Sequence, residues 1–281
     1  MAYKSILVHL NNEGRVARLM SAAMQLALSS NSHVTGLFVV PAAPAKSPLF
    51  PMISGGAIAS AIDGYRKSGD NIRSAFDQAT SGQPVVGEFR LHQAKRPGYV
   101  EAVLDHARPS DIVVAAQKES DWDYADMFDV PDWLAMDSGR PVLIVPKAGE
   151  INSLGERVVV AWNNSRESSR AVFDALPLLV KAREVIVLSV EEAAKPEVTN
   201  DIAGAEIGAT LARHGVKVNV QQVKPGARGD AGVELLSQVA AHRADLLVMG
   251  CFGRSRLREF VLGGASRHVL QNATVPVLMS H

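Results

Sequence analysis

The residues with the clearest chemical meaning are four glycines near the carboxyl end of the sequence, within MGCFGRSRLREFVLGGASRHVL (249–270). They are Gly250 and Gly253 and, after nine intervening residues, Gly263 and Gly264. Glycine lets backbone amides approach an anion closely and adopts positive φ angles without strain. Three arginines lie between the two pairs: Arg254, Arg256 and Arg258. The segment is therefore typical of a phosphate-binding loop.

A purely structural explanation of this segment stays open, because glycines that follow strands are common turn formers. The segment is not a Walker A loop, since no Gly-Lys-Ser/Thr follows, and it lacks the GxGxxG dinucleotide pattern. The apolar pattern after Gly264 predicts a helix whose free amides favour phosphate. The three arginines are also compatible with a solvent-exposed surface that binds no ligand.

Other chemical candidates are weaker. Cys251, the single cysteine, lies inside the glycine segment, but a small packed side chain explains it better than redox chemistry. The eight histidines show no paired zinc-ligand spacing, so no metal site is predicted. His9, near the end of the first apolar run, is the histidine to inspect. No nucleophile–base pair is recognisable, and no catalytic residue is assigned.

The elements that position these residues alternate between short apolar runs and longer helical patterns. In the second half the runs cover 157–162, 184–190, 216–223, 245–249 and 274–279. Helical spacing of apolar residues fills the intervals between them. Such alternation predicts an α/β fold with a parallel sheet covered by helices on both faces.

The sequence repeats itself. Residues 6–8 correspond to 158–160, Asn11-Asn12 to Asn163-Asn164, residues 109–117 to 243–251, and residues 139–146 to 273–280. This pattern predicts two duplicated domains, 1–147 and 156–281, joined by the polar segment KAGEINSLGE. Each would be an open five-stranded sheet of flavodoxin- or Rossmann-like order 3-2-1-4-5.

The expected strand order brings two features together. In open α/β sheets, ligands bind beyond the carboxyl ends of the strands, where the strand order reverses. Asn163-Asn164 ends the first strand of the second half, and Gly250 follows its fourth strand. Both would therefore lie at one crevice.

The spacing Gly250-x2-Gly253-x9-Gly263, the lead-in LLVMG and the late strand VPVL resemble the universal stress protein family. With the duplication, nearly the whole chain resembles a tandem member. The resemblance implies a bound ATP or AMP, possibly with magnesium, in the C-terminal domain. The nucleotide-binding residues would be Gly250, Gly253, Arg254, Gly263, Gly264, Ser266, Ala161, Trp162, Asn163 and Val190.

Two of these positions depart from the family pattern. Gly264 stands where the family has Ser or Thr, which removes one hydroxyl donor worth about 0.5–1.5 kcal/mol, and Ser266 could replace it. Asn163 stands where the family often has Asp and is a poorer magnesium ligand.

The first half lacks the glycine segment. After its fourth strand it reads KESDWDYADMFDVPDW, with five aspartates and no glycine. Negative charge repels phosphate, so no nucleotide is expected in the N-terminal domain. Trp122, Phe128 and Trp133 among these aspartates favour a packed or partner contact.

Composition narrows the functional class. Lys plus Arg equal Asp plus Glu at 29 each, which argues against nucleic acid or membrane as a partner. One cysteine, no signal-peptide pattern and no apolar stretch of ~20 residues favour the cytoplasm.

The leading hypothesis is a stress-response nucleotide sensor in which the last strands, RPVLIVP and VPVLMS, pack together and two chains form a homodimer. Hydrolysis of ATP would be weak at most. The alternative is a degenerate scaffold that acts through protein contacts or an apolar ligand. A nucleotide-consuming enzyme is the third, and it would need an acid, a base or a metal-binding carboxylate beside the glycine segment, where we assign none.

Overall fold

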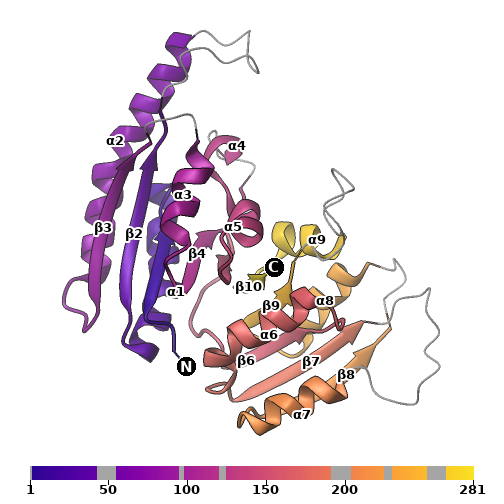
Figure 1. Ribbon diagram of the computed structural model, residues 1–281. Coiled ribbons are helices and arrows are strands. Elements are labelled where there is room, and N and C mark those ends of the chain that lie inside the picture. Colours follow the sequence, from indigo (N-terminus) through magenta and orange to yellow (C-terminus); the bar gives the residue numbers. More distant parts are fainter. Residues whose placement is uncertain are drawn as a thin grey trace. The chain divides into compact units, whose positions relative to one another are not determined.

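The computed structural model describes residues 2–42, 55–94, 98–119, 125–190, 204–224, 230–251 and 264–281 (Figure 1). The chain divides into two compact units. One comprises Tyr3–Ser138, and the other comprises Gly139–His281 with the first two residues of the chain. Each unit is an α/β structure around its own parallel strands.

The N-terminal unit contains four parallel strands in the order β3-β2-β1-β4. The strands are β1 (Ser5–His9), β2 (His33–Val40), β3 (Val86–Gln93) and β4 (Ile112–Ala116). The helices are α1 (Glu13–Ser30), α2 (Gly55–Thr80), α3 (Tyr99–Ala107), α4 (Ala125–Phe128) and α5 (Pro131–Asp137).

Strands β1 and β4 contribute much of the core of this unit. All five residues of β4, and every residue of β1 after Ser5, are buried, as expected for strands covered on both faces. Helices α1 and α2 pack against each other, and α3 covers the opposite face of the sheet (Figure 1). The carboxyl ends of β1 and β4 therefore meet at one edge of the sheet, in register from the pair Ile6–Ile112 onward.

The C-terminal unit contains six strands in the order β5-β10-β9-β6-β7-β8. The strands are β5 (Val142–Val145), β6 (Arg157–Ala161), β7 (Glu184–Val190), β8 (Val218–Val223), β9 (Leu246–Gly250) and β10 (Val277–Ser280). The helices are α6 (Arg166–Leu179), α7 (Ala205–Arg213), α8 (Ala231–Ala241) and α9 (Gly264–Asn272). Strand β5 runs antiparallel to β10, and the other strands are parallel.

The predicted α/β fold class is confirmed. In the C-terminal unit β8-β7-β6-β9-β10 is the complete order 3-2-1-4-5, and the N-terminal unit has its first four positions. The fifth strand of the first repeat, β5, belongs to the other compact unit, where Leu143 lies opposite Leu278. The two last strands thus pair as expected, while the domain boundaries 1–147 and 156–281 stay a prediction.

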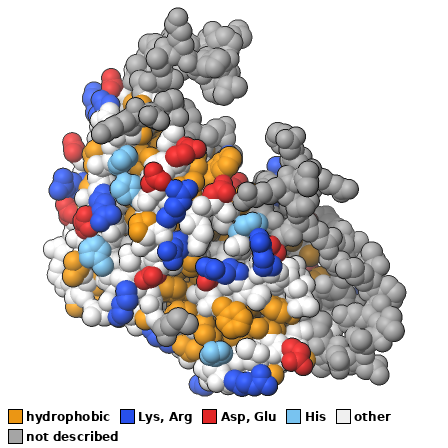
Figure 2. Space-filling view, viewed as in Figure 1, with side chains coloured by type: hydrophobic (Ala, Val, Ile, Leu, Met, Phe, Trp, Pro, Cys, Tyr) orange, Lys and Arg blue, Asp and Glu red, His pale blue; other side chains and the backbone are white. Residues whose placement is uncertain are grey.

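The described surface has mixed charge. On the face drawn in Figure 2, basic and acidic side chains are interspersed and do not form one broad patch of a single sign. Within the described ranges, no helix is long and apolar enough to cross a membrane.

Candidate functional site

The chain that leaves β6 turns sharply into α6. The side-chain oxygen of Asn163 accepts a hydrogen bond from the backbone N–H of Ser165 at 3.2 Å. Asn164 has a φ of 58°, a left-handed conformation that asparagine tolerates better than most residues. Ser165 then caps α6, because its hydroxyl accepts from the Ser168 amide at 3.1 Å while the Ser168 hydroxyl accepts from the Ser165 amide.

Gly250, the last residue of β9, lies against the first turn of α6. A Cβ at this position would lie 2.5 Å from the backbone nitrogen of Ser168 and 2.7 Å from the carbonyl oxygen of Glu167, with the Glu167 carbonyl carbon closer still. Only glycine allows this approach of strand and helix. Gly250 therefore has a packing reason that is independent of any ligand.

Several predicted site residues lie together at the carboxyl ends of neighbouring strands. Ala161 ends β6 and pairs with Met249 of β9, immediately before Gly250. The Trp162 amide donates to the Leu188 carbonyl of β7 at 2.9 Å, so Trp162 continues along that strand. Ala161, Trp162 and Val190 are half-buried and Asn163 is exposed.

The remaining predicted residues fall into two groups. Gly264 and Ser266 lie in the first turn of α9, where Gly264 is exposed and Ser266 is buried. Among the described residues, no atom lies within 4 Å of the position of a Cβ on Gly264. Gly253, Arg254 and Gly263 lie outside the described residues, so their role in a site stays a prediction. Cys251 is buried, and its thiol contacts the Ser280 carbonyl at 3.4 Å.

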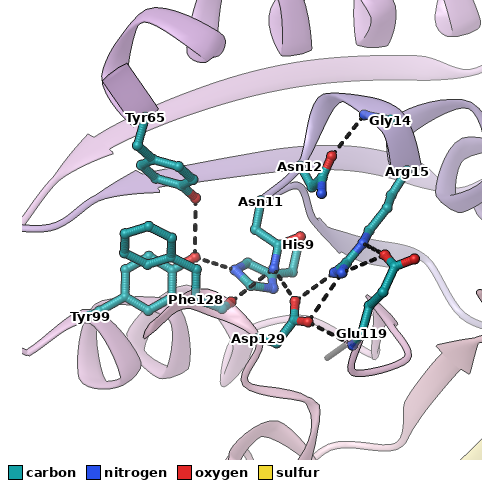
Figure 3. A network of polar contacts seen from close by, with 10 residues as sticks. All are labelled: His9, Asn11, Asn12, Gly14, Arg15, Tyr65, Tyr99, Glu119, Phe128 and Asp129. Carbon is teal, nitrogen blue, oxygen red and sulfur yellow. Dashed lines mark hydrogen bonds and ion pairs between the residues drawn. The ribbon is translucent and has the colours of Figure 1, made fainter. Parts of the chain in front are cut away.

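The equivalent edge of the N-terminal unit holds a buried anion of the chain itself (Figure 3). The Asp129 carboxylate, whose side chain is 1% exposed, pairs with the guanidinium of Arg15 at 2.6 and 3.2 Å. Asp129 also accepts from the Asn11 side-chain amide at 2.8 Å and from the backbone N–H of Glu119 at 3.1 Å. The Glu119 carboxylate contacts Arg15 as well, at 2.8 Å.

An aromatic cluster lies beside this anion (Figure 3). The ring of Phe128 stacks on Tyr65 with centroids 4.0 Å apart and lies 5.0 Å from Tyr99. The Tyr99 hydroxyl is 2.8 Å from Nε2 of His9 and 3.5 Å from the Tyr65 hydroxyl. Burial, followed by the charge of Arg15, lowers the pKa of His9 from 6.5 to about 3, so this imidazole is neutral.

Phe128 and Asp129 thus occupy the carboxyl edge at β1 and β4 with a ring and an anion. A buried carboxylate held by a guanidinium, a side-chain amide and a backbone N–H shows that this edge can bind negative charge. In the described part of the chain, no group of three or more His, Cys, Asp or Glu side chains is arranged to hold a metal ion.

Two charged residues at these edges were not identified as site residues by the sequence patterns. Asp129 is one of five aspartates in its segment, and nothing in the sequence distinguishes it. Glu167 follows Arg166 at the start of α6 and reads as an exposed first-turn acid, yet it is buried beside Gly250. The internal repeat is the one signal that could have revealed Glu167, because it aligns this residue with Arg15.

Residues 155–281 match the model of the Universal stress protein family. No protein of the curated set matches the chain. A universal stress protein from Archaeoglobus fulgidus DSM 4304 has 17% identity and a TM-score of 0.68, with 99% of this chain and 96% of that chain covered. A functionally unknown protein from Pseudomonas aeruginosa PAO1 has 15% identity and a TM-score of 0.58, covering 99% and 92%.

Proposed function

We propose that residues 155–281, which match the model of the Universal stress protein family, bind an adenine nucleotide, ATP or AMP. The nucleotide would sit at the carboxyl edge formed by β6, β7 and β9. The protein would act as a sensor or regulator in the stress response, with hydrolysis slow or incidental.

The observation that supports this proposal most directly is the convergence of three segments at the strand-order reversal. β6 is the first strand of its repeat, and it lies between β9 and β7. Ala161 at its end is flanked by Gly250 of β9 and by the end of β7, and ligands of open α/β sheets bind at such a point. The predicted phosphate-binding glycines follow directly from this edge in the sequence.

The N-terminal unit supports the proposal by analogy within the chain. Its Asp129 carboxylate is held at the same edge, at the ends of the first and fourth strands, by a backbone amide and a cation. We propose that this internal anion excludes phosphate from the N-terminal site. One chain would then bind one nucleotide.

The experiment that tests the proposal has two steps. Purified protein is denatured, and the supernatant is examined by chromatography and ultraviolet absorbance for released adenine nucleotide. Calorimetry with ATP and with AMP then compares the wild type with Gly253→Val. Gly64→Ala is the matched control, because a Cβ at Gly64 of α2 meets no atom within 4 Å in the described part of the chain. Equal heats for wild type and Gly253→Val would contradict the glycine-loop site.

A gain-of-affinity variant makes the test sharper. Gly264 lies at the start of α9, where a serine side chain would displace no neighbour among the described residues. Gly264→Ser restores the hydroxyl of the family pattern and is expected to tighten nucleotide binding by about 2- to 10-fold, the value of one hydrogen bond. Gly264→Ala should leave the affinity unchanged.

A second candidate function is a scaffold that binds no nucleotide. It is favoured by the packing role of Gly250, which explains this glycine without a ligand. Absence of both released nucleotide and binding heat would select it. Under either function we place the protein in the cytoplasm and expect a homodimer, which light scattering at several protein concentrations would test.

A further inference from the structure

Glu167 is a buried carboxylate at the edge where the nucleotide is proposed to bind. Its side chain is 9% exposed, and its backbone contacts the position that a Cβ of Gly250 would take. Within the described ranges its charged partner is Arg166, whose guanidinium Nε lies 3.2 Å from one Glu167 oxygen. The Arg166 side chain is 77% exposed, so solvent competes for this pair, which is therefore weak.

The internal repeat indicates which way this helix position faces. An offset of 152 residues aligns Arg15 with Glu167, and an offset of 134 aligns Glu119 with Gly253. In the N-terminal unit the Arg15 guanidinium reaches the Glu119 carboxylate, with 3.0 Å between Nε and Oε2 (Figure 3). A side chain at this position of the first helix thus reaches the segment that follows the fourth strand.

The same alignment locates the expected phosphate. In the N-terminal unit the Asp129 carboxylate accepts from the backbone N–H of Glu119, the counterpart of Gly253, and from Arg15, the counterpart of Glu167. An anion bound at the corresponding place in the C-terminal unit would meet a carboxylate in place of the guanidinium. The charge at this position is therefore inverted between the two repeats.

A nucleotide phosphate next to the buried carboxylate of Glu167 would be repelled by its negative charge. A divalent cation removes this conflict, because Mg²⁺ is commonly held by one or two carboxylates together with substrate phosphates and water. One carboxylate does not hold Mg²⁺ firmly by itself, so the metal would arrive with the nucleotide. Asn163, exposed at the same edge, supplies a neutral oxygen only.

We propose that Glu167 binds a Mg²⁺ ion that bridges it to the nucleotide phosphates, so that nucleotide affinity depends on Mg²⁺ through this one residue. The inference rests on the proposed nucleotide site and adds the residue that makes the site selective for the metal complex. Free nucleotide would be disfavoured by the same carboxylate.

The test is a two-by-two calorimetric comparison of ATP binding by the wild type and Glu167→Gln, in Mg²⁺ and in EDTA. For the wild type, removal of Mg²⁺ should weaken binding on the order of tenfold or more. Glu167→Gln should bind ATP equally in both buffers, and in EDTA it should bind more tightly than the wild type. Glu206→Gln is the matched control, since Glu206 is an exposed first-turn acid of α7.

The outcomes separate the two proposals. If the wild type binds no ATP in either buffer, the proposed function fails. If the wild type binds ATP but Glu167→Gln keeps the same Mg²⁺ dependence, the nucleotide site stands and the inference about Glu167 is wrong.

A second measurement covers the case in which Glu167→Gln does not fold. Glu167→Asp keeps the charge on a shorter side chain, so it should retain the Mg²⁺ dependence. Electron paramagnetic resonance of Mn²⁺ with ATP should then show a protein-bound metal spectrum for the wild type and Glu167→Asp. A spectrum of Mn²⁺–ATP unchanged by wild-type protein, under conditions where calorimetry shows binding, would overturn the inference.

Discussion

Acid should destabilise the N-terminal unit through His9. The imidazole is fully buried beside Tyr99, and its pKa falls from 6.5 in an unfolded chain to about 3 in the fold. A lowered pKa means that the unfolded chain binds the proton more tightly, so stability is complete above pH 6.5 and is lost as the pH falls toward 3.

The size of the effect follows from these two values. A pH of 5 lies about 1.5 units below the pKa of the imidazole in the unfolded chain, so that imidazole is protonated, whereas the imidazole in the folded protein remains neutral. The free energy of unfolding therefore falls by about 2 kcal/mol. This figure depends almost entirely on the unfolded pKa, because any folded value well below 5 gives the same result. His9→Gln removes the titrating group while keeping a polar side chain next to Tyr99.

The assay is urea unfolding at pH 7.5 and pH 5 in a Trp162→Phe background. The two remaining tryptophans, Trp122 and Trp133, both lie in the N-terminal half, so fluorescence reports on that half alone. His9→Gln should lose about 2 kcal/mol less than its parent between the two pH values. His106→Gln is a second test and not a control, because burial lowers the pKa of the half-buried His106 as well, so this variant should also lose less stability in acid than its parent. Equal losses for the parent and His9→Gln would refute the reasoning.

Three further substitutions and one control substitution test the packing of the two edges by urea unfolding. Gly250→Ala should cost about 1–3 kcal/mol because its Cβ would overlap the backbone of α6, whereas Gly264→Ala, in open space, should cost nothing. Ser165→Ala removes the cap of α6 and should cost about 1 kcal/mol, detected by circular dichroism. Asp129→Asn should cost about 3 kcal/mol in the Trp162→Phe background, since Arg15 then keeps its buried charge with a weaker set of partners. Costs below 0.5 kcal/mol at Gly250 or Asp129 would contradict the contacts described.

Much of the fold could be predicted from the sequence because local patterns determine it. The apolar runs at β6 and β9 are buried on both faces, and such strands show their burial directly in composition. Because the sequence is duplicated, the order of elements in one repeat also predicts their order in the other. The unit to which β5 belongs could not be predicted, since that depends on long-range packing that a four-residue apolar strand does not encode.

Only part of the candidate site could be predicted from the sequence, for a related reason. Gly250 has the residue type of an anion-binding loop, but the contact that demands glycine comes from α6, about 80 residues earlier in the chain. Asp129 is one of several aspartates in its segment and Glu167 follows Arg166, and only tertiary packing makes these two carboxylates buried. A charged residue in a polar segment is expected to be exposed to solvent, so a charged residue that is buried can be recognised only from the three-dimensional structure.

The pairing of β5 with β10 has a consequence for what happens when the chain is cut. Residues 147–150, just after β5, are exposed, so a protease can reach the peptide that joins the two repeats. A nick there leaves the strand Val142–Val145 bound to Val277–Met279 through backbone hydrogen bonds and buried side chains. The two fragments should therefore remain associated after cleavage and separate only in denaturant, in the manner of a split protein reassembled by strand complementation.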